Sequence, residues 1–275
     1  MNYRHAYHAG NFADVMKHTA LVAVLLHLRK KDAPFAVIDT HAGRGLYDLS
    51  GTEAQKTGEA GEGVARLGGV SAANEAIGTY LDTVRSFGPL TYPGSPLIAA
   101  RLLRPQDRLV AIEKHPEEYE ALAAALRPFR KARALCADGY ARLSTVLPPQ
   151  ERRGAILIDP PFEAADEFAK MADAAGNALR RFATGIYLLW FPIKSKSDAD
   201  ALSGEVLARG ATKVLRIMLD IGASSEGRLS QAGLLVINPP FGFDTQMREA
   251  LSALAGPLGR AGPAQWSVEW LAGAE

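Results

Sequence analysis

The sequence predicts an α/β fold: a mainly parallel, doubly wound sheet of seven strands, the last of them antiparallel, with a small helical insertion. Two observations support this prediction. Helical stretches separate apolar runs that show no alternation, as expected for strands buried on both faces of a parallel sheet. Acidic residues close several of these runs, at Asp39, Glu113 and Asp138. Because ligands bind at the carboxyl ends of parallel strands, we expect these acids to face one site.

Composition narrows the class of protein. The 275 residues are 48% hydrophobic and 22% charged, which predicts an ordinary globular chain with a proper core. The single cysteine, Cys136, stands in an apolar run; it rules out a disulfide framework and a thiolate metal cluster, and suits a reducing cytoplasm. No stretch approaches a membrane span, so we expect a cytoplasmic protein without a membrane partner. A formal net charge of +1 neither supports nor excludes nucleic acid as a partner.

The chain begins with a loop and a helix. Apolar residues recur at helical spacing between residues 11 and 31, and Asn11 is the expected N-cap. Four of the six histidines fall here: His5, His8, His18 and His27. Their spacings match no standard zinc pattern and no cysteine accompanies them, so we predict no metal site and favour polar contacts to substrate or cofactor.

The first strand, residues 34–39, leads into a glycine-rich turn. Asp39 closes the strand, and Gly43 and Gly45 follow within the turn. Glycine lets a backbone approach a ligand at the edge of a sheet. The G-x-G-x-x-G spacing of hydride-transferring enzymes is absent. An acid, small residues and Gly-x-Gly are instead the arrangement by which methyltransferases hold the methionine part of S-adenosylmethionine.

An insertion separates this turn from the next helix. The next convincing helix start is Ser95-Pro96, with Ser95 as N-cap and proline at the first helical position. We therefore divide the chain into residues 1–46, a helical insertion at 47–94 with its best helix at 73–87, and the remainder of the main domain at 95–275. Acidic residues outnumber basic ones in the insertion, which speaks against a phosphate clamp.

Two further strands end in acids that suit a nucleoside. Residues 108–113 end in Glu113, where nucleotide-binding α/β folds accept both ribose hydroxyls. Residues 133–139 bring Asp138 to a position that can take an adenine amino group, with the Gly139 backbone beside the ring. A solvated strand end is the commoner explanation of any one acid, but three acids at three strand ends favour a ligand.

The fourth strand, residues 155–159, carries the most specific chemistry. Asp159 closes it, Pro160-Pro161 end it because proline donates no backbone hydrogen bond, and Phe162 adds a flat apolar face. The lone pair of an exocyclic amine such as adenine N6 is delocalised until acceptors engage its hydrogens. Asp159 and the Pro160 carbonyl can be those acceptors, and Phe162 can stack on a flipped base. A tight turn after a core strand would explain the two prolines equally well.

A second Pro-Pro motif closes the last strand. Strands are expected at residues 185–192, 213–221 and 234–238, and the loop 222–233 is too short for a helical crossover, so the last two strands should be antiparallel. The motif Asn238-Pro239-Pro240-Phe241 then lies at the opposite edge of the sheet. We interpret it as a structural turn.

These motifs together resemble one family. Tyr3-Arg4-His5, His8 to Asn11, Ala13 to Val15 and Lys17-His18 are similar to the N-terminal signature of the RlmJ family, bacterial enzymes that methylate N6 of an adenine in large-subunit (23S) ribosomal RNA. The later family motifs follow in the same order: Asp39 to Gly43, Tyr92 to Pro96, Asp138-Gly139, Ile158 to Pro161 and Ile237 to Pro240. Two positions depart from the common pattern: Phe162 often is tyrosine, and Arg44 stands where a small residue is usual.

The resemblance implies a Rossmann-like class I methyltransferase fold and S-adenosyl-L-methionine as cofactor. It implies cofactor contacts at Lys17, His18, His41, Ser95, Glu113, Asp138, Gly139 and Asp159, to which the glycine turn adds Asp39 and Gly43. Asp159 is the implied catalytic residue, with Pro160 and Phe162 beside it. The expected partner is protein-free large-subunit ribosomal RNA, and the expected state is a monomer.

Three alternatives stay open. A DNA adenine methyltransferase would use the same residues, and a protein-amide methyltransferase can use a similar motif for a glutamine side chain. A non-catalytic nucleic-acid-binding protein, linked to the use of external DNA, would bind no S-adenosylmethionine. Basic clusters at residues 29–31, 127–133, 152–153 and 180–181 can contact RNA, although a solvated helix end explains any single one.

Overall fold

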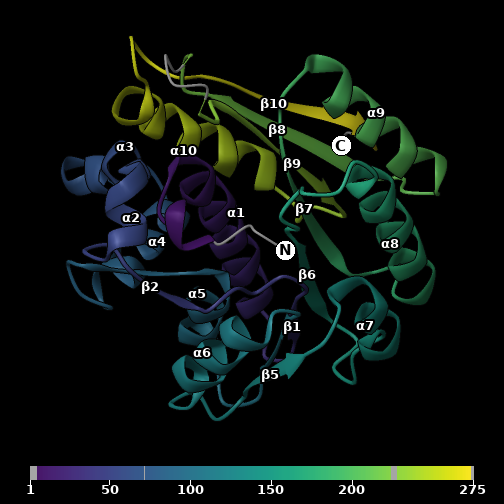
Figure 1. The fold of residues 1–275 in the computed structure, drawn as a ribbon. Coiled ribbons are helices and arrows are strands. Elements are labelled where there is room, and N and C mark those ends of the chain that lie inside the picture. Colours follow the sequence, from purple (N-terminus) through teal and green to yellow (C-terminus); the bar gives the residue numbers. More distant parts are fainter. Residues whose placement is uncertain (1–4, 71, 224–227, 274–275) are drawn as a thin grey trace.

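An eight-stranded mixed sheet runs through the computed structural model, which describes residues 5–70, 72–223 and 228–273 (Figure 1). Across the sheet the strands are β10 (Gln265–Ala272), β8 (Val214–Asp220), β9 (Gln231–Ile237), β7 (Ile186–Pro192), β6 (Gly154–Ile158), β1 (Ala36–Asp39), β4 (Arg108–Glu113) and β5 (Ala132–Cys136). From β5 to β7 all neighbours are parallel. β9 is antiparallel to both β7 and β8, and β10 is antiparallel to β8.

This sheet confirms the predicted α/β class and corrects the strand count. The prediction of seven strands missed β10, so the described sheet contains two antiparallel strands, β9 and β10, and not one. β10 is an edge strand, and most of its side chains are only half-buried. Its sequence therefore lacks the unbroken apolar run by which the buried strands could be recognised.

The other edge strand, β5, also differs from expectation. Cys136 was predicted within an apolar run, but it lies exposed at the end of β5. An edge strand has a neighbour on one side only, and no side chain of β5 is fully buried. The apolar character of this run therefore does not place the thiol in the core.

Helices cover both faces of the sheet (Figure 1). One face carries α1 (Phe12–Arg29), α4 (Glu75–Arg85), α5 (Ser95–Leu102), α6 (Pro116–Leu126) and α10 (Phe243–Leu258). The other carries α7 (Gly139–Val146), α8 (Glu167–Arg181) and α9 (Lys196–Ala208). Each face has its own hydrophobic core. Helix α1 packs against α4, α5 and α10 and is buried along almost its whole length, so its polar residues lie inside the protein.

The caps of two helices bear on the site. Asn11 is the predicted N-cap of α1, and its side chain accepts a hydrogen bond of 3.0 Å from the Asp14 amide. The prediction that Ser95 caps α5 was wrong, because Gly94 holds the cap position and Ser95 is the first helical residue. The Ser95 hydroxyl instead donates a hydrogen bond of 2.6 Å to the Asp39 carboxylate.

Residues 47–94 fold as short helices that lie beside α1. They contain α2 (Thr52–Thr57), α3 (Glu59–Glu62), the 3-10 helix η2 (Val64–Gly69) and α4, which is the helix predicted at 73–87. The strands β2 (Leu46–Asp48) and β3 (Thr91–Pro93) pair at the two ends of this segment. We propose to treat the segment as one insertion, since this pairing brings its ends together.

The second Pro-Pro motif lies at the opposite edge of the sheet from the first, as predicted. β9 runs antiparallel to β7, and Asn238 follows its carboxyl end. The Asn238 side chain donates hydrogen bonds of 2.8 Å to the Ala183 and Gly185 carbonyls. These bonds occupy its amide in a structural turn.

None of the helices within the described residues has the length and apolar character that crossing a bilayer requires.

Candidate active site

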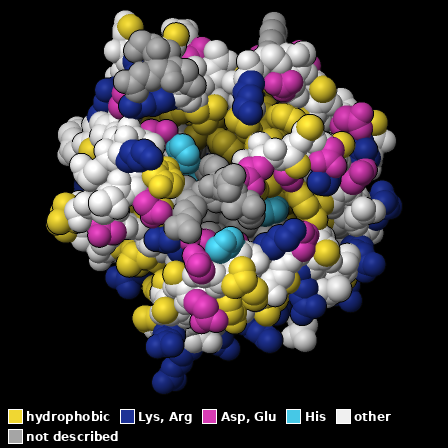
Figure 2. Space-filling model, in the orientation of Figure 1, with side chains coloured by type: hydrophobic (Ala, Val, Ile, Leu, Met, Phe, Trp, Pro, Cys, Tyr) yellow, Lys and Arg dark blue, Asp and Glu magenta, His cyan; other side chains and the backbone are white. Residues whose placement is uncertain are grey.

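A cavity of about 1370 Å³ opens at the carboxyl ends of the parallel strands. On the face shown in Figure 2, histidine and acidic side chains lie close together beside a hollow with hydrophobic walls. All the predicted site residues except Asp39 line this cavity: Lys17, His18, His41, Gly43, Ser95, Glu113, Asp138, Gly139, Asp159, Pro160 and Phe162. The structure thus brings together residues from α1, the turn after β1, and the ends of β4, β5 and β6.

Asp39 lies behind the cavity wall. It is 1% exposed, and Ser95 is its side-chain hydrogen-bond donor. Burial raises the pKa of Asp39 to about 7, against the opposing effect of the Ser95 bond. Asp39 therefore supports the wall by holding Ser95 at the start of α5.

Glu113 is fixed by backbone amides. Its two carboxylate oxygens accept hydrogen bonds from Gly43, at 2.9 Å, and from His115, at 2.7 Å. Burial raises the pKa of Glu113, although these amides favour the charged form. The glycine turn is therefore tied to the end of β4.

The unusual Arg44 does not disturb this turn. Its guanidinium donates to both oxygens of Glu118 in α6, at 2.7 and 2.9 Å. Gly43 has a φ of +59°, and a Cβ there would lie 2.2 Å from the Tyr47 hydroxyl. The positive φ therefore favours glycine at position 43, while the long side chain at position 44 finds a partner away from the turn.

Asp138 and Gly139 bring the start of α7 close to the turn after β1. Asp138 caps α7 by accepting from the Ala141 amide at 3.1 Å, and its other oxygen binds Lys114 at 3.0 Å. Burial would raise the pKa of Asp138, but these two bonds lower it. A Cβ at Gly139 would lie 2.0 Å from the Thr40 carbonyl oxygen. The bare backbone at 139 lets the start of α7 touch the turn after β1.

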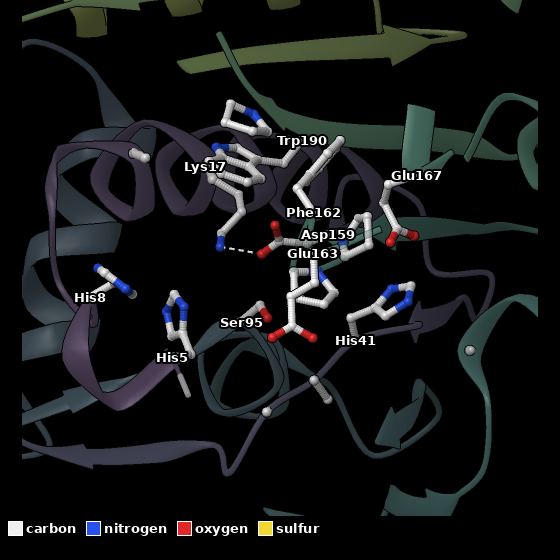
Figure 3. Close-up of a pocket in the computed structure, with 18 of the residues that line it drawn as sticks. His5, His8, Lys17, His41, Ser95, Asp159, Phe162, Glu163, Glu167 and Trp190 are labelled. Atoms are coloured by element: carbon white, nitrogen blue, oxygen red, sulfur yellow. Dashed lines mark hydrogen bonds and ion pairs between the residues drawn. The ribbon is translucent and has the colours of Figure 1, made fainter. Parts of the chain in front are cut away.

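Asp159 follows the last residue of β6, where Lys17 from α1 meets it (Figure 3). The Lys17 ammonium contacts the Asp159 carboxylate and also lies 2.8 Å from Asp14. Burial would lower the pKa of Lys17, but the two carboxylates outweigh burial and raise it well above its usual value. Lys17 is therefore a permanent cation in the wall of the site.

Asp14 is a site residue that the sequence did not single out. It is 1% exposed and accepts hydrogen bonds from His5, at 3.0 Å, and from the Gly10 amide, at 2.9 Å. Burial would raise its pKa, but Lys17 and His5 hold it well below the usual value. An acid one turn before Lys17 on the buried side of α1 was the available signal.

His18 and His41 are both neutral near pH 7. Burial lowers the pKa of His18 to about 3 and that of His41 to about 4. His18 Nδ1 lies 2.7 Å from the Tyr92 hydroxyl, and among the described residues its buried Nε2 has no hydrogen-bond partner. The His41 ring meets Tyr140 edge to face, with 4.9 Å between centroids. Neither imidazole adds a cation to the cavity.

Aromatic rings line the cavity beside Asp159. Phe162 lies 4.9 Å from Phe168 and 5.9 Å from Trp190, measured between ring centroids. The Lys17 ammonium lies 5.7 Å from the Trp190 ring centroid. The Phe162 backbone has a φ of +51°, so the turn after the two prolines is sharp and uncommon for a side chain of this size. The sequence predicted Phe162 as a site residue, but not Phe168 or Trp190. Their rings meet that of Phe162 only in the folded chain.

The chain is similar to known proteins over nearly its whole length. A family model described as "Ribosomal RNA large subunit methyltransferase D, RlmJ" matches residues 32–272. Two proteins named "Ribosomal RNA large subunit methyltransferase J" match 98% of this chain and 99% of their own length, from Haemophilus influenzae at 39% identity and from Escherichia coli at 40%. The crystal structure of protein LPL1258 from Legionella pneumophila superposes with a TM-score of 0.87 at 32% identity, covering 95% of this chain and 98% of that one.

These matches confirm the resemblance found in the sequence motifs and the Rossmann-like methyltransferase fold. The part of the signature at Tyr3 and Arg4 lies outside the described residues. Both matches extend over nearly the full length of this chain and of the relative. The chain belongs to the RlmJ family of ribosomal RNA large subunit methyltransferases.

Proposed function

We propose that this protein transfers a methyl group from S-adenosyl-L-methionine to N6 of an adenine in large-subunit ribosomal RNA. The observation that carries the proposal is the position of Asp159. It lies beside Pro160 and Phe162, is held by Lys17, and shares one cavity with Glu113 and Asp138. The site for the target amine, at Asp159, thus lies next to the site for the nucleoside of the cofactor, at Glu113 and Asp138.

The residues of the cavity fit the cofactor. Glu113, held by two backbone amides, suits the ribose hydroxyls, and Asp138 suits the adenine amino group. Gly43 and Gly139 present bare backbone to the cavity, and Ser95 and His41 complete the wall on the methionine side. When bound, the cofactor supplies an electrophilic methyl group on a sulfonium.

The size of the cavity supports two ligands. Pockets for one small molecule commonly measure roughly 300–1,000 Å³. The cavity here, about 1370 Å³, exceeds that range and extends past Asp159 to Trp190 and the start of α8. This extra room suits a base that has been turned out of its helix.

Asp159 and the Pro160 carbonyl would orient the target amine. Each accepts one N6 hydrogen, which turns the nitrogen lone pair away from the ring and towards the methyl donor. Lys17 holds the Asp159 carboxylate in place while it accepts. The amine becomes acidic once it carries the methyl group, so proton loss needs no strong base. Positioning and electrostatics therefore supply most of the rate effect.

Phe162 and Trp190 would hold the ring of the base. Stacking on an aromatic side chain contributes about 1–3 kcal/mol per base. Phe162 offers this face without the hydroxyl that tyrosine carries in many family members. The neighbouring Phe168 packs against the Phe162 ring, with 4.9 Å between the centroids.

The names of the relatives support ribosomal RNA as the substrate class. We further propose that the substrate is protein-free RNA, that the enzyme acts as a monomer, and that it works in the cytoplasm. A DNA adenine methyltransferase, a protein-amide methyltransferase and a non-catalytic nucleic-acid-binding protein are the competing functions.

One assay separates these functions. Labelled S-adenosylmethionine is offered with protein-free large-subunit ribosomal RNA, duplex DNA or ribosomal protein, and the products are analysed as nucleosides or peptides by mass spectrometry. Label in RNA alone supports the proposal, whereas label in DNA or protein supports the corresponding alternative. Without transfer to any of the three, calorimetry decides: absence of cofactor binding supports the non-catalytic function.

A further inference from the structure

A buried carboxylate of the insertion lies against the N-terminal segment. Glu59 in α3 is only 9% exposed. Its Oε1 lies 2.9 Å from His8 Nδ1, and its Oε2 accepts a hydrogen bond of 3.0 Å from the Asn11 side-chain amide. Burying a carboxylate is costly unless both oxygens find partners. Here both partners come from the N-terminal segment, 48 and 51 residues away in the chain.

The backbone of the insertion approaches the same segment. The Val64 amide donates a hydrogen bond of 2.8 Å to the Gly10 carbonyl, and the Thr57 hydroxyl donates to the Tyr7 carbonyl. A Cβ at Gly63 would lie 2.1 Å from the Gly10 carbonyl oxygen, so only glycine permits this contact. The insertion therefore holds residues 7–11 in place through both backbone and side-chain hydrogen bonds.

Asn11 connects these contacts between the insertion and the N-terminal segment to the active site. The side-chain oxygen of Asn11 accepts from the Asp14 amide, and so begins α1. One Asp14 oxygen accepts from the Gly10 amide, and the other lies 2.8 Å from the Lys17 ammonium. Lys17 in turn contacts Asp159. A continuous chain of polar contacts thus runs from Glu59 through Asn11, Asp14 and Lys17 to the proposed catalytic carboxylate.

We propose that Glu59 is a positioning residue, through which the insertion holds the start of α1 so that Lys17 meets Asp159. The hydrogen-bond partners of the Glu59 carboxylate among the described residues are His8 and Asn11, so its effect on Lys17 and Asp159 passes through them (Figure 3 shows His8 in the same pocket as the Lys17–Asp159 pair, but apart from it). The proposal rests on the proposed function for its effect on rate. This role suits the insertion's excess of acidic residues, because positioning α1 does not require the insertion to attract the phosphates of RNA.

The test compares three variants. Glu59→Ala removes both acceptors. Glu59→Gln retains them in part, because the amide oxygen can accept from Asn11 while its NH₂ donates to a neutral His8. Glu62→Ala is the matched control: Glu62 lies in the same helix, but its carboxylate pairs with Arg260 at 2.8 Å. For each, kcat and KM for ribosomal RNA are measured, together with hydrogen–deuterium exchange in residues 8–17 and in β6.

The expected result is a local one. Glu59→Ala should lower kcat by about tenfold or more, since small misplacements at a site cost this much or more. It should also speed exchange in residues 8–17 and leave β6 unchanged. Glu59→Gln should stay within about threefold of the wild-type kcat, and Glu62→Ala should keep the wild-type exchange in residues 8–17.

Two results would overturn the proposal. One is a Glu59→Ala protein whose kcat and N-terminal exchange match those of Glu62→Ala. The other is faster exchange throughout the chain, β6 included, which would assign Glu59 to general stability. Should the wild-type protein methylate no ribosomal RNA, the proposed function fails by itself. The exchange data then decide alone. Faster exchange confined to residues 8–17 in Glu59→Ala supports the positioning role of Glu59, and unchanged exchange there refutes it.

Discussion

Lys17 and Asp159 stand 142 residues apart in the sequence, yet the ammonium of one contacts the carboxylate of the other. The side chains are 4% and 14% exposed, so the pair is largely removed from water. Lys17 also binds Asp14, and one cation therefore serves two carboxylates. The contact joins α1 to the end of β6, which makes the position of the N-terminal helix part of the proposed catalytic geometry.

Removing this cation should destabilise the protein. In Lys17→Met the two carboxylates lose their shared partner, and breaking a buried ion pair costs about 3–5 kcal/mol. Lys30→Met, at the exposed end of the same helix, should change the free energy of unfolding by less than about 0.5 kcal/mol. Urea unfolding of both variants checks this. Equal unfolding midpoints for the two would contradict the importance of the buried pair.

The buried His18 should make stability depend on pH. Its pKa is about 3 in the folded protein and 6.5 in the unfolded chain, so only the unfolded chain binds this proton between those values. Stability from this group is therefore complete above pH 6.5 and is lost as the pH falls towards 3, by about 1.4 kcal/mol per pH unit.

His18→Asn isolates this effect. Asparagine does not titrate and can keep a hydrogen bond to the Tyr92 hydroxyl. Between pH 7.5 and 4.5 the wild-type protein should lose about 2–3 kcal/mol more than the variant. Urea unfolding at several pH values gives both curves. Parallel curves across this range would show that His18 does not carry the difference.

Gly139 should tolerate no side chain. In Gly139→Ala the new methyl group meets the Thr40 carbonyl oxygen, which belongs to the backbone and cannot swing aside. We expect a loss of about 1–3 kcal/mol in stability and weaker binding of S-adenosylmethionine, measured by urea unfolding and calorimetry.

The matched substitution is Gly204→Ala in α9, where the added Cβ meets no atom within 4 Å among the described residues beyond its own stretch of helix. It should stabilise the protein by about 0.5–1 kcal/mol, since alanine favours a helix. A Gly139→Ala protein as stable as Gly204→Ala would refute the close approach between α7 and the turn after β1.

The sequence predicted the strand ends because their signals are local. Asp39, Glu113 and Asp159 each close a buried apolar run, and parallel strands bring such ends to one edge. The two Pro-Pro motifs could be told apart by strand direction alone. β10 and the pair β2–β3 escaped prediction because edge strands and three-residue strands carry weak apolar patterns.

The polar contacts that support the site could not be predicted in this way. Glu59 is an ordinary helix acid in the sequence, and its partners become visible only when distant segments pack together. Asp14 gave one local signal, its position one turn before Lys17, but its bonds to His5 and to the Gly10 amide depend on the folded N-terminal segment. Ser95 was predicted as the N-cap of α5, but Gly94 holds that position and Ser95 is the first helical residue. The choice between these two positions depended on Asp39, which lies 56 residues earlier.

The most direct test of the account is methyl transfer by wild-type protein and Asp159→Ala. Both are incubated with S-adenosylmethionine and protein-free large-subunit ribosomal RNA, and the nucleosides are analysed by mass spectrometry. The wild-type protein should yield N6-methyladenosine. Asp159→Ala should remain folded by circular dichroism and yield about a hundredfold less or none, since its amine acceptor is gone. Near-normal yield from Asp159→Ala, or a methylated product other than N6-methyladenosine from the wild-type protein, would contradict the account.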